Sequence, residues 1–435
     1  MRTLKNNPWL WVPTLYLVEG IPYVIVNNIS MAMLTAMGVS NGQMALFTSL
    51  LYLPWIIKPL WGSIVEILQT KRWWIITMQV SLIACFVGLV LAIPHPDPAT
   101  VAAHETPIGL FTIMLIIFWI TAFISATHDI AADGFYMLAL NDHDQALFVG
   151  IRSTFYRFAT ILGQGILLGL VGYMSEQMDI TKAWQIGLLS IAAILGICTL
   201  WHTRALPHEE KTTQTQRSLR EILHTFAHTW ITFFQKKGIV IALLFLLLFR
   251  LPEALILKII YPFMMASANE GGLGMSLVQI GLIYALFGMI CLTIGGIFGG
   301  WIVAKINFRR VFWWMVLAIT LPDLAYVYLA YAQPEQLLWI SIAIAIEQFG
   351  YGFGFTAYML YMIRFSKGAY CSMHYAICTM FMALSMMLPG MVAGYLQEAI
   401  GYTAFFILAM ACCFITVIVS LPISKQLKLD PPQHD

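Results

Sequence analysis

The chain has 435 residues, of which 60% are hydrophobic and only 10% are charged, and its mean hydropathy is +0.81. Soluble domains carry about 25% charged residues, so this composition excludes a soluble globular protein and leaves no room for a sizeable soluble domain. The net charge of +2 gives no indication of nucleic-acid binding, and we expect none. The seven cysteines lie in apolar segments without metal-ligand spacing, so we expect neither a metal site nor a disulfide framework.

Long apolar segments follow one another along the whole chain. A membrane-spanning helix needs about 20 predominantly apolar residues, and this criterion predicts twelve spans. The first span follows a short basic N-terminus and lacks a small-residue cleavage site, so we interpret it as a retained helix and not as a signal peptide. The predicted spans are residues 9–33, 42–63, 73–93, 107–135, 148–174, 183–203, 238–265, 277–304, 311–332, 337–362, 370–396 and 402–423.

Lysine and arginine are distributed unevenly over the segments between these spans. They fall in the two terminal segments and in the loops that follow even-numbered spans, with Lys182 as the exception. Positively charged loops stay in the cytoplasm, so the pattern predicts that both termini are cytoplasmic. It also supports the count of twelve, because one missed span would scramble the alternation.

The only long polar loop divides the chain in the middle. We therefore predict an N-terminal six-helix bundle (1–203), a cytoplasmic linker (204–237) and a C-terminal six-helix bundle (238–435). Within the linker, apolar residues at helical spacing from Leu219 to Phe234, with Ser218 and Glu221 as a capping box, predict an amphipathic helix on the cytoplasmic face. This helix is either a tether between the two bundles or a regulatory docking site.

The two halves resemble each other. Residues 38–44 and 274–280 open spans 2 and 8 with similar sequences, and Glu19 of span 1 and Glu253 of span 7 each lie near a proline that could unwind the backbone. A six-plus-six parallel repeat with a central loop is the plan of the major facilitator superfamily, whose substrate site lies between the halves near the midplane. The predicted fold is therefore an all-α membrane protein of twelve transmembrane helices in two six-helix bundles.

One group of charges is predicted in the cytoplasmic third to half of the membrane. Asp129 and Asp133 lie one turn apart in span 4 and share a helix face, and Lys58, Arg152 and Arg157 are expected at a similar depth. A charge at such a position is costly and usually marks a partner or a pathway. These residues either form a cytoplasmic gate, in which the carboxylates pair with the cations, or Asp129 binds substrate or a proton. The two interpretations are compatible.

A second group is predicted close to the midplane, where it would line a central cavity. It consists of Glu19, Arg250, Glu253 and Glu347. Arg250 either pairs with Glu253, three residues further on, or clamps an anionic substrate. Glu347 has no cation nearby in its own helix, and burial alone favours the neutral carboxyl, so it is either a proton-coupling residue or a hydrogen-bonded structural one.

The sequence contains no constellation typical of catalysis. It has no nucleotide-binding motif, no zinc motif and no nucleophile elbow, so we expect neither an enzyme nor an ATP-driven pump, and no cofactor other than an ion gradient. Drug efflux is disfavoured because the glycines of span 5 lack the Gly-Pro step of antiporters. A membrane sensor is disfavoured because the central loop and the C-terminal tail are short.

Four stretches resemble a known family. They are residues 53–61 with Leu-Pro, Lys58 and Leu-Trp, residues 125–133 with Asp129 and Asp133, residues 249–254, and residues 346–354 with Glu347 and three glycines. All four are similar to motifs of the AmpG-type muropeptide permeases of the major facilitator superfamily and of the related acetyl-coenzyme A transporter and siderophore permease groups. The sequence departs from the family where His128 stands in place of glutamine and where Arg250 and Glu253 replace lysine and aspartate.

This resemblance implies a function. It implies proton-driven import of an anhydro-muropeptide, a cell-wall fragment, across a bacterial inner membrane by alternating access, with the small-molecule cargo and the lipid bilayer as partners. The alternative cargo is a siderophore or another bulky metabolite. We expect the protein to act as a monomer.

Overall fold

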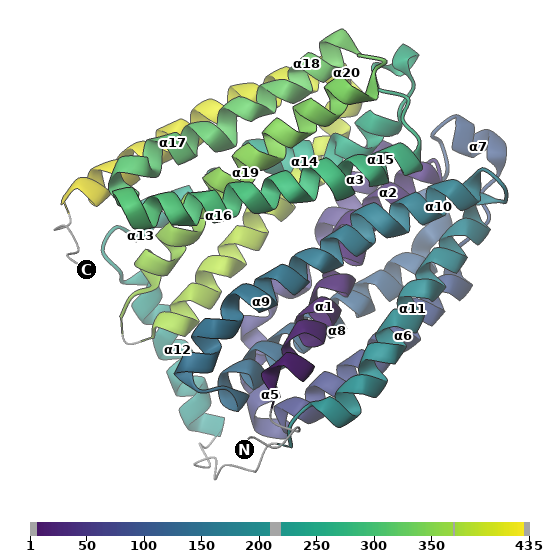
Figure 1. Ribbon diagram of the computed structural model, residues 1–435. Helices are drawn as coiled ribbons and strands as arrows, with labels where there is room; N and C mark the ends of the chain where they lie inside the picture. The colour runs from purple at the N-terminus through teal and green to yellow at the C-terminus, as the bar shows by residue number, and fades with distance from the viewer. Residues whose placement is uncertain (1–6, 209–218, 369, 430–435) are drawn as a thin grey trace. The chain divides into compact units, whose positions relative to one another are not determined.

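The computed structural model describes residues 7–208, 219–368 and 370–429, and all regular structure in these ranges is helical (Figure 1). This confirms the predicted fold class. The helices of the first half are η2 (Pro8–Leu10), α1 (Val12–Val24), η3 (Ile25–Ile29), α2 (Ser30–Ala36), α3 (Asn41–Leu50), α4 (Leu53–Ile57), α5 (Pro59–Leu68), α6 (Lys71–Ala92), α7 (Pro98–Ala102), η4 (Ile108–Phe111), α8 (Thr112–Ala139), α9 (Asp142–Thr160), η5 (Ile161–Leu167), α10 (Leu168–Ser175) and α11 (Ile180–Ala205).

The second half is built in the same way from long helices with short interruptions. Its helices are α12 (Leu219–Phe234), α13 (Ile239–Leu248), α14 (Leu251–Met265), η6 (Ala268–Glu270), α15 (Leu277–Ile283), η7 (Tyr284–Gly288), α16 (Met289–Ile306), α17 (Phe308–Thr320), η8 (Leu321–Asp323), α18 (Leu324–Ala332), α19 (Leu337–Ser366) and α20 (Cys371–Leu429).

The described residues contain twelve segments that are long and apolar enough to cross a membrane. Eleven continuous stretches meet this condition, but the last of them, Met373–Leu427, has 55 residues. At about 1.5 Å per residue such a helix is far longer than a hydrocarbon core of about 30 Å. The backbone of Gly401 (φ 77°, ψ 168°) is not helical and divides this stretch into two spans. The count therefore agrees with the twelve spans expected from the sequence.

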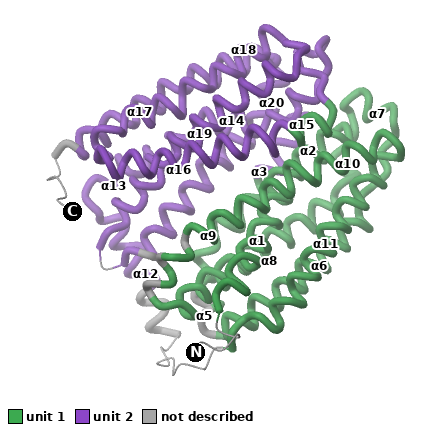
Figure 2. The backbone as a smooth tube through the Cα atoms, in the orientation of Figure 1, with its two compact units in different colours: residues 1–40, 50–219, 276–282 green, residues 41–49, 220–275, 283–435 purple. Residues whose placement is uncertain are grey.

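The chain forms two compact units. Unit 1 contains residues 1–40, 50–219 and 276–282, and unit 2 contains residues 41–49, 220–275 and 283–435 (Figure 2). Nearly all of α3 is thus counted with unit 2, and nearly all of α15 with unit 1. The predicted bundle boundaries at residues 203 and 238 stay a prediction.

Unit 1 is organised around α1, which packs on α8 and α9, and around α6, which packs on α8 and α11. A core cluster lies at the N-terminal end of α1. Its fully buried side chains include Trp11, Leu15, Ile75 and Phe135. Trp11 and Phe135 pack edge to face, with ring centroids 5.1 Å apart. These contacts fix the axial rotation of α1 and α8, and with it the direction of their polar side chains.

Unit 2 is organised around α19 and α20, which pack on α16, α17, α13 and α14. A Cβ atom added to Gly295 or Gly352 would collide with the backbone of the opposite helix, at Phe349 and Leu292 respectively. Small residues of this kind let two membrane helices approach closely. The amphipathic helix predicted in the linker is present as α12, and its Phe233 is fully buried in the core of unit 2; Ser218 of the predicted capping box lies outside the described residues.

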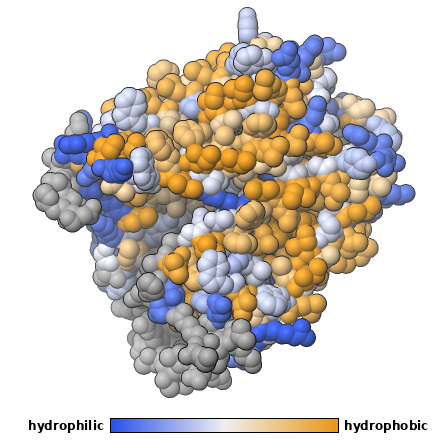
Figure 3. Space-filling view, in the orientation of Figure 1, coloured by the Kyte–Doolittle hydropathy of each residue, from blue (hydrophilic) through white to orange (hydrophobic). Residues whose placement is uncertain are grey.

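Apolar side chains cover most of the face seen in Figure 3. Large hydrophobic residues of several spans are strongly exposed, among them Leu91, Ile113, Ile197 and Ile297. Extended exposed apolar surface is unfavourable in water and suits a hydrocarbon environment. The structure therefore has the surface of a multi-pass membrane protein.

Candidate functional site

Unit 1 contains a cluster of charged side chains within its helix packing. Five of its members were predicted from the sequence, and one, a tyrosine, was not. We call it the charge cluster; it consists of Tyr16 and Glu19 of α1, Lys58 at the junction of α4 and α5, Asp129 and Asp133 of α8, and Arg152 of α9.

A break in span 2 presents Lys58 to the cluster. The helix is interrupted at residues 51–52, shortly before Pro54, and again at Lys58, directly before Pro59. Proline cannot donate a backbone hydrogen bond within a helix. Lys58 forms an ion pair with Asp129, and both side chains are mostly buried. The pair joins span 2 to span 4.

Asp133, one turn further along α8, has a different set of partners. Its Oδ1 accepts a hydrogen bond from the Tyr16 hydroxyl at 3.0 Å and lies 2.8 Å from Nη2 of Arg152. The Arg152 guanidinium lies over the Tyr16 ring, 4.4 Å from its centroid, and 5.2 Å from that of Tyr136. Aromatic faces attract a guanidinium, so the two tyrosines and the carboxylate together hold Arg152 in place.

Glu19 completes the cluster beside Asp129. Its carboxyl group lies close enough to those of Asp129 and Asp133 for the three to interact electrostatically, and its Oε2 is buried and receives no hydrogen bond from a described donor. Buried carboxylates that lie near one another repel, and a proton on one of them removes that repulsion. The charge cluster holds three carboxyl groups and two cations, so a single proton on the Glu19–Asp129 pair balances its charge.

The backbone near Glu19 differs from the expectation. Pro22 was expected to unwind the helix, but Glu19 lies within the regular helix α1, and the irregular part is the π-helix η3, which begins three residues after Pro22. π-Helical turns occur frequently at functional sites.

A second set of hydrogen-bonded polar side chains crosses unit 1 and includes His128, the neighbour of Asp129 in the sequence. Its central residue, Gln79 of α6, contacts Nε2 of His128 at 3.0 Å and Nδ1 of His202 at 3.0 Å, and Nε2 of His202 contacts the hydroxyl of Thr14 at 2.9 Å. These hydrogen bonds therefore link α8, α6, α11 and α1. The side chains are mostly fully buried, and connected polar networks of this kind fix one packing arrangement.

Unit 2 contains the second pair of predicted residues. Arg250 donates to both carboxylate oxygens of Glu253, from Nε at 2.9 Å and from Nη2 at 2.6 Å, and it also donates to the Tyr351 hydroxyl at 3.0 Å. The helix is interrupted between α13 and α14, where Arg250 has φ −100° and ψ 14° and Pro252 is the second residue of the next helix. The expected backbone break beside Glu253 is thus present.

Glu347 of α19 lies in a different environment. Its Oε2 accepts hydrogen bonds from the Tyr326 hydroxyl at 3.0 Å and from the amide of Gln348 at 2.8 Å, and the side chain is buried. Both donors, a phenol hydroxyl and an amide, are neutral groups. This carboxyl is therefore held by hydrogen bonds that either protonation state can keep, at least in part.

The structure brings some predicted residues together and separates others. Lys58 and Arg152 lie on the two aspartates, as the gate interpretation expects, and Arg157 lies half-buried five residues further along α9. Glu19, which was grouped with the midplane residues, lies near Asp129 within unit 1; its depth in the membrane stays a prediction.

Sequence reasoning missed the neutral members of the site. They are uncharged residues that hydrogen-bond to a predicted charge, pack an aromatic ring on one, or belong to the buried network through Gln79. Tyr16 precedes Glu19 by three residues and Tyr351 follows Glu347 by four, spacings that place each pair on one helix face, so this signal was available. The missed residues are Thr14, Tyr16, Gln79, Tyr136, His202, Tyr326 and Tyr351.

A family model described as "Major Facilitator Superfamily" matches residues 15–371. The chain belongs to the Major Facilitator Superfamily. The match covers most of the chain and includes the charge cluster and the Arg250–Glu253 pair. The protein is accordingly a transporter of this superfamily, embedded in the membrane by several spans.

Two similar proteins indicate which group within the superfamily this chain resembles. The chain is 25% identical to "Putative transporter AmpG 4" of Rickettsia felis, with 93% of this chain and 92% of the relative covered. It is 20% identical to "Anhydromuropeptide permease" of Escherichia coli K12, with 94% and 78% covered. The resemblance to AmpG-type transporters inferred from the four motifs is thereby confirmed over nearly the whole chain.

Solved structures of other transporters share the fold. The chain superposes on a D-xylose-proton symporter with a TM-score of 0.68 at 13% identity, covering 97% of both chains. The nucleoside transporter NupG gives a TM-score of 0.67 at 15% identity, covering 99% of this chain and 100% of the other. At these identities the likeness concerns the fold alone.

Proposed function

We propose that this chain imports an anhydro-muropeptide across a bacterial inner membrane by alternating access and that the import is driven by the proton gradient. The cargo is suggested by the AmpG-type relatives. The N-terminus and the C-terminus lie in the cytoplasm, as the lysine and arginine distribution indicates.

The observation that carries the proton coupling is the proximity of the Glu19 carboxyl group to that of Asp129. A carboxyl pair inside a membrane bundle, in a cluster with one more carboxyl group than cations, has a place for one proton. Loss of that proton leaves Glu19 and Asp129 in repulsion and strengthens the attraction of Asp129 to Lys58. A change of this kind can bias a bundle between two packings.

In this scheme Lys58, Arg152 and Arg157 are the gate cations, and Asp129 and Asp133 are their carboxylate partners. Arg250, Glu253 and Glu347 line the cargo site, and Glu19 couples transport to the proton. The scheme needs no catalytic group and no cofactor, because the gradient supplies the free energy.

Uptake into proteoliposomes tests the proposal. Purified protein is reconstituted, and accumulation of radiolabelled anhydro-muropeptide is followed with an inward proton gradient, without a gradient, and with a protonophore. We expect accumulation only with the gradient. Accumulation that persists after the gradient is collapsed contradicts the coupling, and absence of uptake under all three conditions contradicts the cargo; uptake of a ferric siderophore in a parallel assay then assigns the alternative.

The variant Glu19→Gln separates coupling from binding. Glutamine resembles the protonated carboxyl group, so the variant should still exchange internal for external cargo, a process that needs no net proton movement, but should lose gradient-driven accumulation. The matched control is Glu176→Gln, at the exposed end of α10, which should leave both activities unchanged. Equal loss of exchange and accumulation in Glu19→Gln would assign Glu19 to cargo binding.

A further inference from the structure

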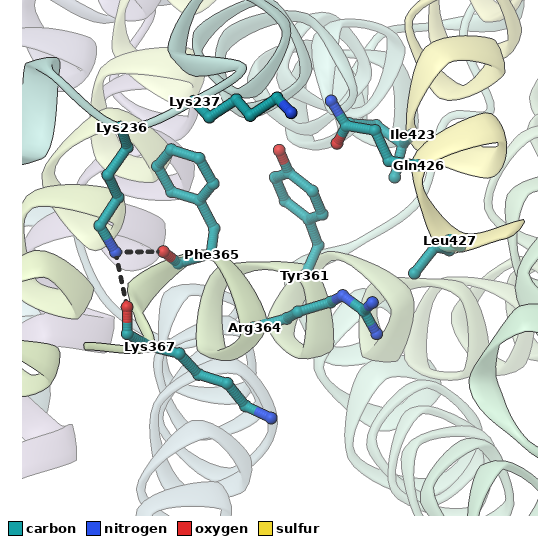
Figure 4. Close-up of a pocket in the computed structure, with 9 residues that line it drawn as sticks. All are labelled: Lys236, Lys237, Tyr361, Arg364, Phe365, Lys367, Ile423, Gln426 and Leu427. Carbon is teal, nitrogen blue, oxygen red and sulfur yellow. Dashed lines mark hydrogen bonds between the residues drawn. The ribbon is translucent and has the colours of Figure 1, made fainter. Parts of the chain in front are cut away.

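A basic cavity lies in unit 2 at the ends of three helical segments, away from the residues discussed so far. Its volume is about 310 Å³. It lies where α12 leads into α13, where α19 ends and where α20 approaches its own end. The polar residues that line it are Lys236, Lys237, Tyr361, Arg364, Lys367 and Gln426 (Figure 4).

The wall of this cavity is anchored by Lys236. Its Nζ donates to the carbonyl oxygen of Phe365 at 2.5 Å and to that of Lys367 at 2.9 Å, so it satisfies carbonyl groups at the C-terminus of α19, where a cation is favourable. Burial lowers the pKa of Lys236 below its ordinary value. Lys236 is thus a structural residue that holds the α12–α13 connection against α19.

Gly238 turns the chain at this point. It has φ +79°, which side chains other than hydrogen rarely adopt, and an added Cβ would lie 3.0 Å from the Nε2 atom of Gln426. The turn allows Lys237 and Gln426 to face the cavity from different elements, as Figure 4 shows. The basic side chains are therefore positioned by the fold and are not scattered surface charges.

The described lining of the cavity is basic. Four of the described residues that line it are lysine or arginine, and none is aspartate or glutamate. Like charges that converge on one space repel each other, and an anion in that space removes the repulsion. Arginine and lysine are the side chains that bind phosphate groups.

A second observation points independently to a ligand. The side chain of Tyr361 is only 4% exposed, yet its hydroxyl has no hydrogen-bond partner among the described residues. In Figure 4 this hydroxyl points into the space between Lys237 and Gln426. A buried hydroxyl without a partner is unfavourable, and an oxyanion at this position would accept its hydrogen bond.

We propose that this cavity binds a phosphate oxyanion, supplied by the head group of an anionic phospholipid. The polar wall continues into apolar residues, Phe365, Ile423 and Leu427, which suit the glycerol and acyl region of a lipid. The spans end at Ser366 and Leu427 and begin at Ile239, so the cavity lies at the level of the membrane surface. Basic pockets at the cytoplasmic ends of membrane helices are suited to anionic head groups. A free phosphate-bearing solute offers the same oxyanion without the apolar part.

Native mass spectrometry of the delipidated full-length protein tests this proposal. The protein is titrated with phosphatidylglycerol, with phosphatidylcholine, which has the same phosphate but no net charge, and with inorganic phosphate. We expect preferential binding of phosphatidylglycerol, reduced about tenfold by Tyr361→Phe, which removes one hydrogen bond to a charged group. The double variant Lys237→Gln/Lys367→Gln should abolish the preference.

The control is a double variant that removes two positive charges at another position in unit 2. Arg309→Gln/Arg310→Gln alters two cations at the start of α17, on the same expected side of the membrane, and should leave the lipid preference unchanged. Thermal unfolding of each variant verifies that it is folded. Equal binding of the two lipids, or equal losses in the control, would overturn the proposal. Tyr361-dependent binding of inorganic phosphate without a preference for phosphatidylglycerol would overturn the lipid as its source.

Discussion

The guanidinium of Arg250 binds both carboxylate oxygens of Glu253. The two side chains are 8% and 14% exposed, and the pair forms at the break between α13 and α14, where Arg250 has left the helical conformation. A fork-to-fork contact fixes both position and direction. In this conformation Glu253 is the principal anion of Arg250, so an anionic cargo would have to compete with it.

Removing one partner of this pair should destabilise the protein strongly. Glu253→Gln leaves a buried guanidinium without its anion, and loss of one partner of a buried pair costs about 3–5 kcal/mol. Thermal unfolding in detergent measures the effect. The double variant Arg250→Lys/Glu253→Asp, which restores the residue types of the resembling family, should recover most of the stability. An unchanged unfolding temperature in Glu253→Gln would show that the pair is dispensable.

The sequence predicted the helices and the charged members of the site, but not their neighbours. Hydropathy alone predicted the spans because each lies in hydrocarbon, and charge alone identified Asp129 and Lys58 because a buried charge is rare there. Glu19 was assigned to the midplane group by its expected depth in the membrane. The sequence indicates that depth, but it does not say which helices are adjacent to α1. The packing of α1 against α8 belongs to the tertiary structure, and it brings Glu19 near Asp129.

The hydroxyl of Tyr16 should contribute a separable part of the charge cluster. Tyr16→Phe removes the hydrogen bond to the charged Asp133 but keeps the ring under Arg152, so we expect a loss of stability of about 1.5–3 kcal/mol. Tyr16→Leu removes the ring as well and should cost more. Both are measured by thermal unfolding. Identical losses would show that Arg152 gains nothing from the aromatic face.

The buried chain through Gln79 should be sensitive to loss of its central amide. Gln79→Leu leaves His128 and His202 without that partner, and each buried polar group without a hydrogen bond costs about 1–3 kcal/mol. Gln185→Leu is the matched control, because that glutamine makes a single hydrogen bond to the carbonyl of Val90 and its loss should cost less.

His128→Gln tests the other end of the same chain. Glutamine is the usual residue at this position in the resembling family, and its amide can replace the contact with Gln79, so stability should be largely kept. His128→Leu cannot replace that contact and should resemble Gln79→Leu. If His128→Gln is as destabilised as His128→Leu, the imidazole is required for its shape and not for its hydrogen bond.

The predicted orientation can be tested with a native cysteine. Cys371 at the start of α20 is exposed, and the predicted topology places it in the cytoplasm. A membrane-impermeant maleimide should label it in inverted vesicles and not in intact spheroplasts, and Cys371→Ser should remove the signal. A cysteine introduced by Glu335→Cys, in the exposed connection between α18 and α19, should show the opposite pattern. Labelling of Cys371 from outside would invert the topology.

Asp129 provides the sharpest distinction between a gate and a cargo site. Asp129→Asn removes the charge that binds Lys58 and the carboxyl group beside Glu19, so it should abolish gradient-driven uptake while cargo binding remains measurable by tryptophan fluorescence or calorimetry. The double variant Lys58→Gln/Asp129→Asn removes both charges together and should be more stable than Asp129→Asn, because no cation is left buried without its partner. Loss of binding in Asp129→Asn, with the Lys58→Gln variant still able to bind, would reassign Asp129 from the gate to the cargo.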